Sequence, residues 1–248
     1  MKHKGFKKFL RILFIYIPLG FLILTCSWVL MLRWVPVYFT PLMIVRTFQN
    51  FGDDTYQTYK TWKPLPDISP NLAMAVMASE DTRFLDHYGF DMVEIDHALD
   101  AQKRGKKLRG ASTISQQTAK NVFLFPGRSW VRKGFEAYFT GLIELLWGKE
   151  RIMEVYLNVA EMGRGIFGAE AAAQRLFQTR ASKLSTRQAA LIAATLPNPI
   201  KRKANVPTAY ISDRAGSIQR MMNLIAKPEW LNKKSGTKIE KKQKKTGK

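Results

Sequence analysis

The stretch Ser69-Pro-Asn-Leu-Ala-Met-Ala-Val-Met-Ala-Ser-Glu80, continued by Asp81-Thr-Arg-Phe-Leu-Asp-His-Tyr-Gly89, gives the clearest indication of the fold. Ser69 is a residue type that caps helices, and Pro70 suits the first helical position, where a missing N–H costs nothing. From Asn71 onward, apolar residues recur with a helical period and form one stripe, made of Leu72, Ala73, Val76 and Met77. The stretch therefore predicts an amphipathic helix over Asn71 to Glu80.

Glu80 is an acidic residue at the end of this predicted helix. With a rotation of about 100° per residue, Glu80 projects between Ala73 and Val76, whereas Asp81 is expected to point away from the stripe. We expect partial desolvation to raise the pKa of Glu80 toward the range of a general base. An ion pair with a neighbouring cation is the alternative, and it is the commoner fate of an inward Glu.

Composition bounds the class of protein. The chain has 248 residues, of which 46% are hydrophobic, enough for one domain with a core. A net charge of +21 indicates an anionic partner: nucleic acid, a lipid surface or a phosphorylated substrate. The single cysteine, Cys26, excludes an internal disulfide and a Cys-based zinc site. Because the three histidines are few and scattered, we expect no metal site held by His and Cys. No cofactor is expected to be required.

The segment from Ile12 to Leu32 contains no charged residue and is long enough to span a bilayer, which takes about 20 residues. Basic residues crowd the preceding positions 1–11, whereas only Arg33 follows closely, so the N-terminus is predicted to be cytoplasmic. A cleaved signal peptide is the alternative. It is disfavoured because the apolar run is long and no small-residue cleavage site follows it. Residues 12–32 are thus interpreted as a retained single-pass transmembrane helix.

Residues 33–67 are interpreted as an interfacial segment and a neck. Pro36 and Pro41 oppose a second regular span, and the aromatic residues around them are typical of a membrane interface. A strand or core segment is an equally good interpretation of residues 34–45. The polar stretch from Phe51 to Asp67 is expected to lead into the globular part.

Residues 68–228 are predicted to form one all-α domain, because the apolar period is helical almost throughout and no sustained alternation with period two occurs. Asp91 with Glu94, and Ser185 with Gln188, are candidate capping boxes, and Ser129 is a candidate cap. The further helices are expected from Asp91 to near Gly105, and over 129–147, 149–160, 168–177, 186–196 and 208–226. The lysine-rich tail, residues 229–248, is predicted to be disordered.

The stretch Gly110-Ala-Ser-Thr-Ile-Ser-Gln-Gln-Thr-Ala-Lys-Asn121 is dense in hydroxyl and amide side chains. Such groups bind sugar hydroxyls and N-acetyl amides, although a polar helix start has a similar composition. A cluster of cations begins at its end: Lys120, Arg128, Arg132 and Lys133. Glu136 lies four residues after Arg132 and can orient it. Clustered cations suit phosphate or pyrophosphate, and a solvated basic helix face is the alternative.

A second carboxylate is predicted on another helix. Within Lys149-Glu-Arg-Ile-Met-Glu-Val-Tyr-Leu-Asn158, the apolar residues share one face, and Glu154 and Asn158 share the opposite face. This opposite face is expected to be open to solvent or to a cleft. Paired carboxylates in different surroundings are how glycosyl chemistry divides its roles, which makes Glu80 and Glu154 candidates.

Five blocks of the chain resemble, in order, the bacterial peptidoglycan glycosyltransferases, and specifically the monofunctional biosynthetic transglycosylases of Gram-negative bacteria. The blocks are Glu80-Asp-x-x-Phe84-x-x-His87-x-Gly89, Gly110-Ala-Ser-Thr-Ile-Ser-Gln-Gln117, Arg132-Lys-x-x-Glu136, Lys149-x-x-Ile-x-Glu154-x-Tyr-x-Asn158 and Leu196-Pro-Asn-Pro199. The similarity covers about residues 34–226. Ala111 stands where a Gly is usual, and Ser115 where a Thr is usual.

The resemblance implies a lysozyme-like helical domain in the periplasm, anchored in the bacterial inner membrane. By analogy, Glu80 is the general base that deprotonates the 4-hydroxyl of an acceptor lipid II. That oxygen attacks C1 of the lipid-linked chain with inversion and expels undecaprenyl pyrophosphate, while Glu154 organises the donor side. The implied substrate-binding residues are Asp81, Phe84, His87, Ser112, Thr113, Gln116, Gln117, Lys120, Asn121, Arg128, Arg132, Lys133, Glu136 and Asn158. The resemblance also implies inhibition by the phosphoglycolipid moenomycin, contact with other cell-wall synthesis or division proteins, and room for a divalent cation (Mg²⁺ or Mn²⁺) at the pyrophosphate.

Two alternative functions differ in their chemistry. A membrane-anchored lytic transglycosylase or muramidase would cleave the same glycan, but it has no pyrophosphate to bind, so the cation cluster favours synthesis. A membrane-anchored nucleic-acid or partner-binding protein would explain the charge, yet much of that charge lies in the two termini and no nucleic-acid recognition motif occurs. We therefore expect glycan synthesis and no nucleic-acid partner.

Overall fold

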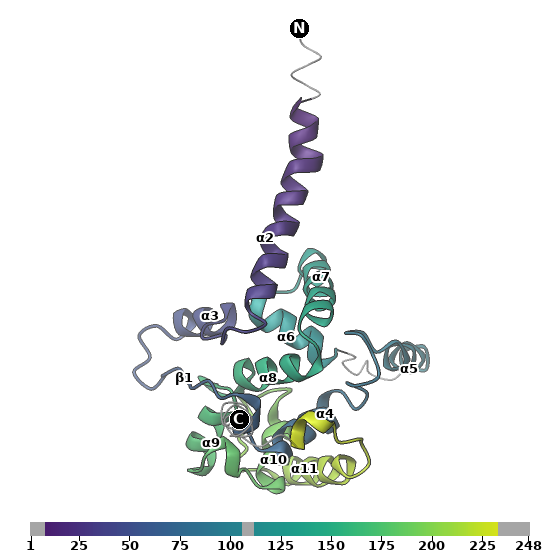
Figure 1. Cartoon of the computed structure of the whole chain (residues 1–248). Helices are drawn as coiled ribbons and strands as arrows, with labels where there is room; N and C mark the ends of the chain where they lie inside the picture. Colours follow the sequence, from purple (N-terminus) through teal and green to yellow (C-terminus); the bar gives the residue numbers. More distant parts are fainter. Residues whose placement is uncertain (1–7, 106–111, 233–248) are drawn as a thin grey trace, which may run out of the picture.

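The computed structural model describes residues 8–105 and 112–232 (Figure 1). A helix from Lys8 to Met31 is long and apolar enough to cross a membrane, and it stands out from the globular part. Its first residues, 8–11, are α-helical; a short π-helical turn, Ile12–Tyr16, follows, and the helix continues as α2, Ile17–Met31. This helix covers nearly all of the segment 12–32 that the sequence predicts as transmembrane.

The lower end of α2 belongs to the core of the globular part. Val29 and Leu32 are buried there, and the indole N–H of Trp147 donates a hydrogen bond to the Val29 carbonyl at 2.7 Å. One turn higher, the hydroxyls of Thr25 and Tyr138 are 2.7 Å apart. The helix is therefore packed onto the globular part and is more than a flexible tether.

The segment after α2 contains a short helix that the sequence did not predict. It is α3, Pro41–Gln49, and the Thr40 side chain caps it by accepting from the Met43 N–H. The strand interpretation of residues 34–45 is therefore wrong. Pro41 opposes a continuous span but starts this helix, because its fixed φ suits the first position. The neck then forms β1, Tyr59–Lys60, and a 3₁₀ turn, Leu65–Asp67.

The globular part is helical, which confirms the predicted all-α class. Its helices are α4 (Pro70–Glu80), α5 (Met92–Lys103), α6 (Ile114–Phe123), α7 (Trp130–Leu146), α8 (Lys149–Val159), α9 (Ala169–Phe177), α10 (Thr186–Thr195) and α11 (Ala209–Met222). A small sheet in the order β1-β3-β2 adds β2, Glu161–Gly163, and β3, Ile166–Phe167. Strands of two or three residues are too short to show an alternating pattern. The lysozyme-like arrangement and the predicted domain boundaries stay predictions.

Helix α4 lies at the centre of one half of the core, where it packs against α10 and α11. Leu72 to Met77 are all buried, so the expected single apolar stripe is wrong: this helix is enclosed almost all round. In the other half, α6 packs against α7 and α8. The C-terminal end of α4 faces α6, and this junction positions the candidate site.

The predicted caps have mixed outcomes. Ser129 caps α7, and Ser185 with Gln188 forms the predicted capping box of α10. Asp91 accepts from two N–H groups of α5, without the reciprocal Glu94 contact of a box. Ser69 does not cap α4, because its hydroxyl donates instead to the Leu184 carbonyl at 2.9 Å.

The beginning of the tail is ordered, contrary to the prediction for residues 229–248. Glu229–Asn232 forms a 3₁₀ turn, in which Leu231 is buried and Trp230 packs against the core. These two apolar residues interrupt the lysine-rich composition and explain the difference. Residues 233–248 lie outside the described part of the chain.

Candidate active site

Glu80 ends α4 at the junction with α6, and its carboxylate accepts two hydrogen bonds. Ser79 Oγ donates to Oε1 at 3.0 Å, and Gln117 Nε2 of α6 donates to Oε2 at 3.1 Å. The hydroxyl of Tyr156 on α8 donates in turn to Gln117 Oε1 at 3.2 Å. Within residues 8–105 and 112–232, no ion pair includes Glu80, so the cation-pair alternative is wrong. Glu80 is half-buried and is oriented by neutral donors.

Asp81 is buried, contrary to the expectation that it points away from the core. Its Oδ1 lies 2.9 Å from His87 Nε2, and its Oδ2 accepts from the Ile114 N–H at the start of α6 at 3.0 Å. The expectation fails because α4 ends at Glu80 and Asp81 has an extended φ of −165°, so helical rotation no longer applies. Asp81 thus ties the end of α4 to the start of α6.

The first turn of α6 is fixed by a capping box. Thr113 Oγ1 accepts from the Gln116 N–H, and Gln116 Oε1 accepts from the Thr113 N–H. The Thr113 hydroxyl also donates to the Gly89 carbonyl at 2.6 Å. Because Thr113 and Gln116 are buried and engaged, the structure places both in the support of the site, whereas Ser112 is exposed. Gly110 and Ala111 lie outside the described residues.

Phe84 and His87 are buried behind the site. Phe84 is 1% exposed and lies in the core under the Lys149 ammonium, which is 4.5 Å from its ring centre. His87, Asp81 and Asp91 bring three possible metal-ligand atoms within 4.8 Å of one another. In this structure the two aspartates hold His87, the α6 N-terminus and the first turn of α5. The contacts of this group are those of a buried structural network.

Three of the four cations of the predicted cluster, Lys120, Arg132 and Lys133, lie near Glu136. Arg132 pairs with the buried Glu136 carboxylate at 3.2 Å, which confirms the four-residue pairing, and Lys133 pairs with its other oxygen. Burial lowers the pKa of Lys120. The Glu136 and Glu80 carboxylates raise this pKa in part, whereas the Arg132 and Lys133 charges lower it further. Lys120 is therefore within electrostatic reach of both Glu80 and the cation pair. Asn121 is half-buried on α6, and Arg128 is exposed on the loop before α7.

Glu154 and Asn158 lie elsewhere, against the neck. Glu154 Oε2 accepts from the Leu65 N–H at 3.0 Å, and its other oxygen pairs with Arg151. Asn158 is fully buried, and its amide bonds the N–H and the carbonyl of Lys63, both at 2.8 Å. The expectation that this face of α8 is open is wrong, because the neck covers it. Among the described residues, Glu154 shares no bonding partner with Glu80.

Residues 46–223 match the model of the transglycosylase family. The chain belongs to this family. A biosynthetic peptidoglycan transglycosylase of Bacteroides thetaiotaomicron is 56% identical over 218 residues, which is 88% of each chain. One of Pseudomonas entomophila, under the same name, is 53% identical over 204 residues, 82% of this chain and 86% of that protein.

Two residues of the hydrogen-bond network around Glu80, Arg214 and Tyr156, are not among those predicted from the sequence. Arg214 of α11 donates from Nη2 to Ser79 Oγ at 3.3 Å, and Ser79 in turn donates to Glu80. Tyr156 of α8 is fully buried, and burial, followed by the Glu80 and Asp81 charges, raises its pKa well above the usual value. Because α11 is far from α4 in sequence, no local pattern could indicate the Arg214 contact.

Proposed function

We propose that this peptidoglycan glycosyltransferase, a transglycosylase family member that polymerises glycan strands for cell-wall synthesis, uses lipid II as its substrate. The observation that supports it best is that α6 carries both Gln117, which donates to the Glu80 carboxylate, and Lys120, whose charge interacts with Glu136 and its paired cations. A base and a set of cations near each other suit the two parts of one displacement reaction. The base takes the proton from the attacking hydroxyl, and the cations stabilise the negative charge of the departing pyrophosphate. The high identity to biosynthetic peptidoglycan transglycosylases agrees with synthesis.

In the proposed reaction, Glu80 accepts the proton of the 4-hydroxyl of an acceptor lipid II. The oxygen then forms a bond to C1 of the lipid-linked donor chain with inversion, and the bond from C1 to the pyrophosphate oxygen breaks. Undecaprenyl pyrophosphate leaves with the bonding electron pair. Lys120, Arg132 and Lys133 stabilise that developing charge, as fixed charges near a leaving group do. Gln117 and Ser79 hold the Glu80 carboxylate through the hydrogen bonds described above.

The other residues predicted to bind substrate differ in how exposed they are. Ser112 and Arg128 are exposed and free to meet substrate, and Asn121 is half-buried. Two further assignments stay predictions. They are the placement of Glu154 on the donor side and sugar contacts by Asp81, Phe84, His87, Thr113, Gln116 and Asn158. The positions of these residues support indirect roles, since most are buried. Mg²⁺ or Mn²⁺ at the pyrophosphate, and contacts with other cell-wall synthesis or division proteins, also stay predictions.

We further propose that the protein sits in the inner membrane with the catalytic domain in the periplasm. The helix Lys8–Met31 supports an anchor. Exposed apolar side chains on α7, including Trp130, Val131 and Leu145, support a second contact with lipid, because patches of this kind rarely face water without a partner. Figure 1 shows α7 beside the lower part of α2, so both can meet the same bilayer.

The substitution Glu80→Gln tests the proposed base. It keeps the shape of the side chain but cannot accept the proton, so polymerisation of labelled lipid II should fall by about 10²-fold or more. The measurement is the glycan product formed by purified full-length protein, with melting temperature as the control for folding. Near-normal synthesis by a folded Glu80→Gln variant would refute the assignment. Release of fragments from finished glycan by the unmodified chain would instead favour the cleaving alternative.

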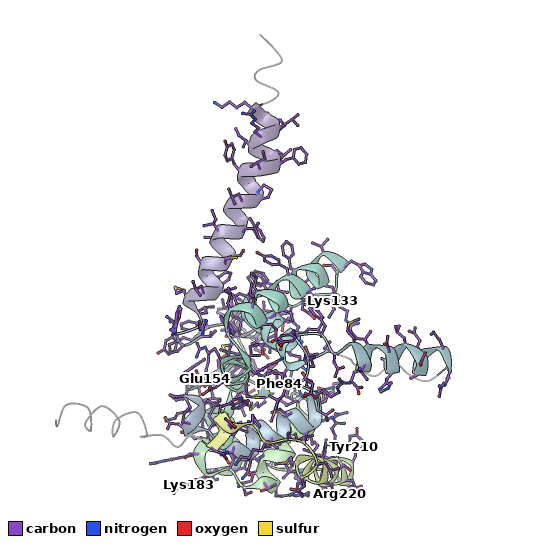
Figure 2. All side chains as sticks on the ribbon, turned by 45° about the vertical axis from the view of Figure 1, so that its right-hand side comes forward. Phe84, Lys133, Glu154, Lys183, Tyr210 and Arg220 are labelled. Carbon is purple, nitrogen blue, oxygen red and sulfur yellow. The ribbon has the colours of Figure 1, made fainter. Side chains whose placement is uncertain are left out.

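Moenomycin tests the cation cluster, because this phosphoglycolipid carries its own phosphate. Lys120→Gln and Arg132→Gln should each weaken moenomycin binding and polymerisation by about tenfold or more, the scale of one lost bond between charged groups. Arg128→Gln should weaken both as well if the exposed guanidinium reaches the phosphate. Lys183→Gln is the matched control, since Lys183 is exposed on the far side of the domain from the membrane helix (Figure 2). Binding and synthesis as in wild type for all three variants would show that the cluster is a solvated face.

A further inference from the structure

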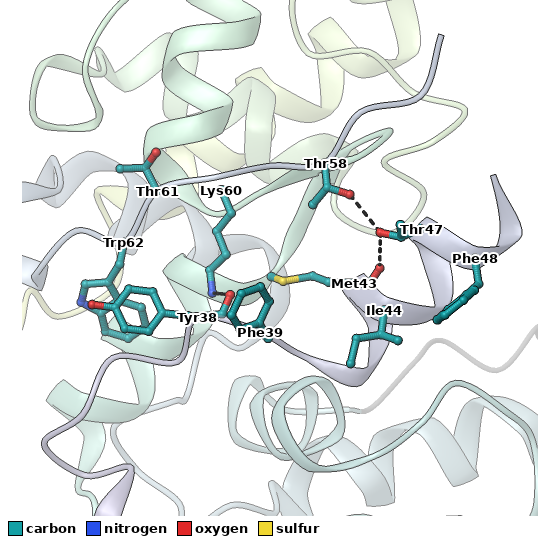
Figure 3. A pocket seen from close by; sticks show the side chains of 10 residues that line it. All are labelled: Tyr38, Phe39, Met43, Ile44, Thr47, Phe48, Thr58, Lys60, Thr61 and Trp62. Carbon is teal, nitrogen blue, oxygen red and sulfur yellow. Dashed lines mark hydrogen bonds between the residues drawn. The ribbon is translucent and has the colours of Figure 1, made fainter. Parts of the chain in front are cut away.

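A pocket of about 810 Å³ lies between α3 and β1, directly after the membrane helix (Figure 3). Its volume falls within the range of about 300–1,000 Å³ that is typical of small-molecule sites. None of the residues that line this pocket takes part in the glycosyl transfer proposed at Glu80. The lining residues are Tyr38, Phe39, Met43, Ile44, Thr47, Phe48, Thr58, Lys60, Thr61 and Trp62.

The walls of this pocket are mostly apolar. Met43, Ile44 and Phe48 of α3 form one wall, and Figure 3 shows Tyr38, Phe39 and Trp62 gathered at one end. Phe39 is 80% exposed and Phe48 is 75% exposed. At the other end the hydroxyls of Thr47 and Thr58 are hydrogen bonded at 3.3 Å. Apolar surface of this kind next to a membrane helix suits a hydrocarbon chain.

One half-buried cation, Lys60, lies among these apolar walls. Its ammonium donates to the Tyr38 carbonyl at 3.0 Å and to the Val37 carbonyl, and it lies 5.9 Å from the centre of the Trp62 ring. In the part of the chain that the structure describes, no carboxylate pairs with Lys60. Burial lowers the pKa of Lys60 to about 8, and no carboxylate counters it. The positive charge thus lacks a counter-anion, which a ligand could supply.

The pocket opens close to the membrane helix. Helix α2 ends at Met31, and α3 lies crosswise beside its lower end (Figure 1). The connecting segment exposes Trp34 and Tyr38, residue types that favour the level of the lipid head groups. If α2 crosses a bilayer, the pocket lies where head groups and the first part of the acyl chains meet. A ligand with a charged head and an apolar tail fits that position.

We propose that this pocket binds an anionic phospholipid of the membrane, with its phosphate beside Lys60 and one acyl chain along Met43, Ile44 and Phe48. The inference rests on the membrane anchoring proposed above but not on the reaction at Glu80. A soluble anion would make no use of the apolar walls, and an uncharged hydrocarbon would leave the Lys60 charge without its counter-anion. The other candidate occupants, a second copy of the chain or the tail of lipid II, are outcomes of the test below.

Native mass spectrometry of the purified full chain in a neutral detergent provides the test. Phosphatidylglycerol and phosphatidylcholine with identical acyl chains are added in separate titrations, and the lipid-bound fraction is measured. We expect one phosphatidylglycerol to bind in preference to phosphatidylcholine. Lys60→Gln should weaken phosphatidylglycerol binding by about tenfold or more, whereas Lys60→Arg, which keeps the charge, should retain it. Ile44→Trp should weaken both lipids by filling the apolar part of the pocket.

Matched controls separate the pocket from general effects. Lys183→Gln removes an exposed lysine and Leu224→Trp enlarges an exposed apolar residue, both outside the pocket, and neither should change lipid binding. Melting temperatures verify that each variant folds. Lys60→Gln and Ile44→Trp act on opposite ends of the ligand. If one of these variants does not fold, lipid binding by the other still tests the proposal.

Three outcomes would overturn the proposal. If all variants bound both lipids equally, the lipids would be coating α2 without entering the pocket. Displacement of phosphatidylglycerol by equimolar lipid II in wild type, together with weaker lipid II binding in Ile44→Trp, would assign the pocket to the substrate tail. A dimer that Ile44→Trp dissociates would assign it to a second copy. Lipid binding does not depend on polymerisation, so a chain that binds phosphatidylglycerol through Lys60 without polymerising lipid II would contradict only the proposed function.

Discussion

At the scale of single residues, the Glu80 carboxylate is held by neutral hydrogen-bond donors, with cations further away. Ser79 holds one oxygen and Gln117 holds the other. A direct ion pair would stabilise the carboxylate but would also hinder it from taking up a proton, because a nearby opposite charge favours the ionised form. Orientation by neutral donors avoids that conflict. The cations that suit the leaving group are instead gathered around Glu136.

Ser79→Ala tests whether this orientation matters. The substitution removes a 3.0 Å hydrogen bond to Glu80 Oε1 and the partner of Arg214, while α4 tolerates alanine well. We expect kcat for lipid II polymerisation to fall about three- to tenfold, the scale of one neutral hydrogen bond, with little change in KM. The kinetic constants of purified protein provide the measurement.

Ser217→Ala is the matched control for Ser79→Ala. Ser217 is exposed on α11, and its hydroxyl donates to the backbone carbonyl of Asp213 within the same helix. Its removal should leave both kinetic constants unchanged. An equal loss of kcat in the two variants, or no loss in Ser79→Ala, would show that Ser79 does not position the carboxylate.

Side-chain positions predicted from helical rotation are correct where the residues lie within one regular helix. The Arg132–Glu136 pair is confirmed because both residues lie within the continuous helix α7. The expectation for Asp81 is wrong because it extends helical rotation one residue past the end of α4. The Arg214–Ser79 contact depends on how α11 packs against α4, and single-sequence periodicity carries no information about such packing.

At the scale of elements, the block from Asp81 to Gly89 joins three helices. Asp81 holds the start of α6, and the Gly89 carbonyl accepts from Thr113, the cap of the same helix. Gly89 itself touches α7: a Cβ there would lie 2.7 Å from Thr140 Cγ2 and 3.1 Å from Glu144 Cγ. The block therefore fixes where Gln117 stands relative to Glu80.

Gly89→Ala tests this close approach. The backbone of Gly89 has a φ of +86°, which alanine rarely adopts, and the added methyl group would collide with α7. We expect the free energy of unfolding to fall by about 1–3 kcal/mol, the scale of backbone strain combined with overpacking. Thermal or denaturant unfolding of the purified protein provides the measurement.

Gly141→Ala is the matched control for Gly89→Ala. Gly141 lies within α7, and a Cβ there would meet nothing within 4 Å. Alanine at this position should stabilise the helix by about 0.5–1 kcal/mol. The two substitutions thus have opposite expected signs, and a stabilised Gly89→Ala variant would contradict the role given to this glycine.

Helices with an apolar period and clear end signals could be predicted from the sequence, as α7, α8, α9 and α10 show. Helix α3 could not, because Pro41 within an apolar run suggests a break and equally suits a helix start. The open face expected for Glu154 and Asn158 is covered by the neck. That contact joins residues more than eighty positions apart, so it follows from tertiary packing alone.

At the scale of the whole molecule, the apolar N-terminal helix and the globular domain form one packed unit. The lower end of α2 contributes Val29 and Leu32 to the core, and Arg151 donates to the Leu32 and Val35 carbonyls. These contacts hold the domain against the C-terminal end of α2. If α2 spans a bilayer, residues 1–11 and the domain must therefore lie on opposite sides of it.

The charge of the N-terminal residues predicts the orientation of this unit. Residues 2–11 contain five basic residues (Lys2, Lys4, Lys7, Lys8 and Arg11) and no acidic one, which favours the cytoplasmic side for the N-terminus. A reporter enzyme that is active only outside the cytoplasm, fused after Lys248, should therefore be active. A reporter that works only in the cytoplasm should be silent at that position and active when fused before Met1. The reverse pattern, from fusions that are stably expressed, would refute the topology. It would also leave the proposed active site on the wrong side of the membrane for a growing cell wall, so the orientation of one helix decides whether the site can meet its proposed substrate.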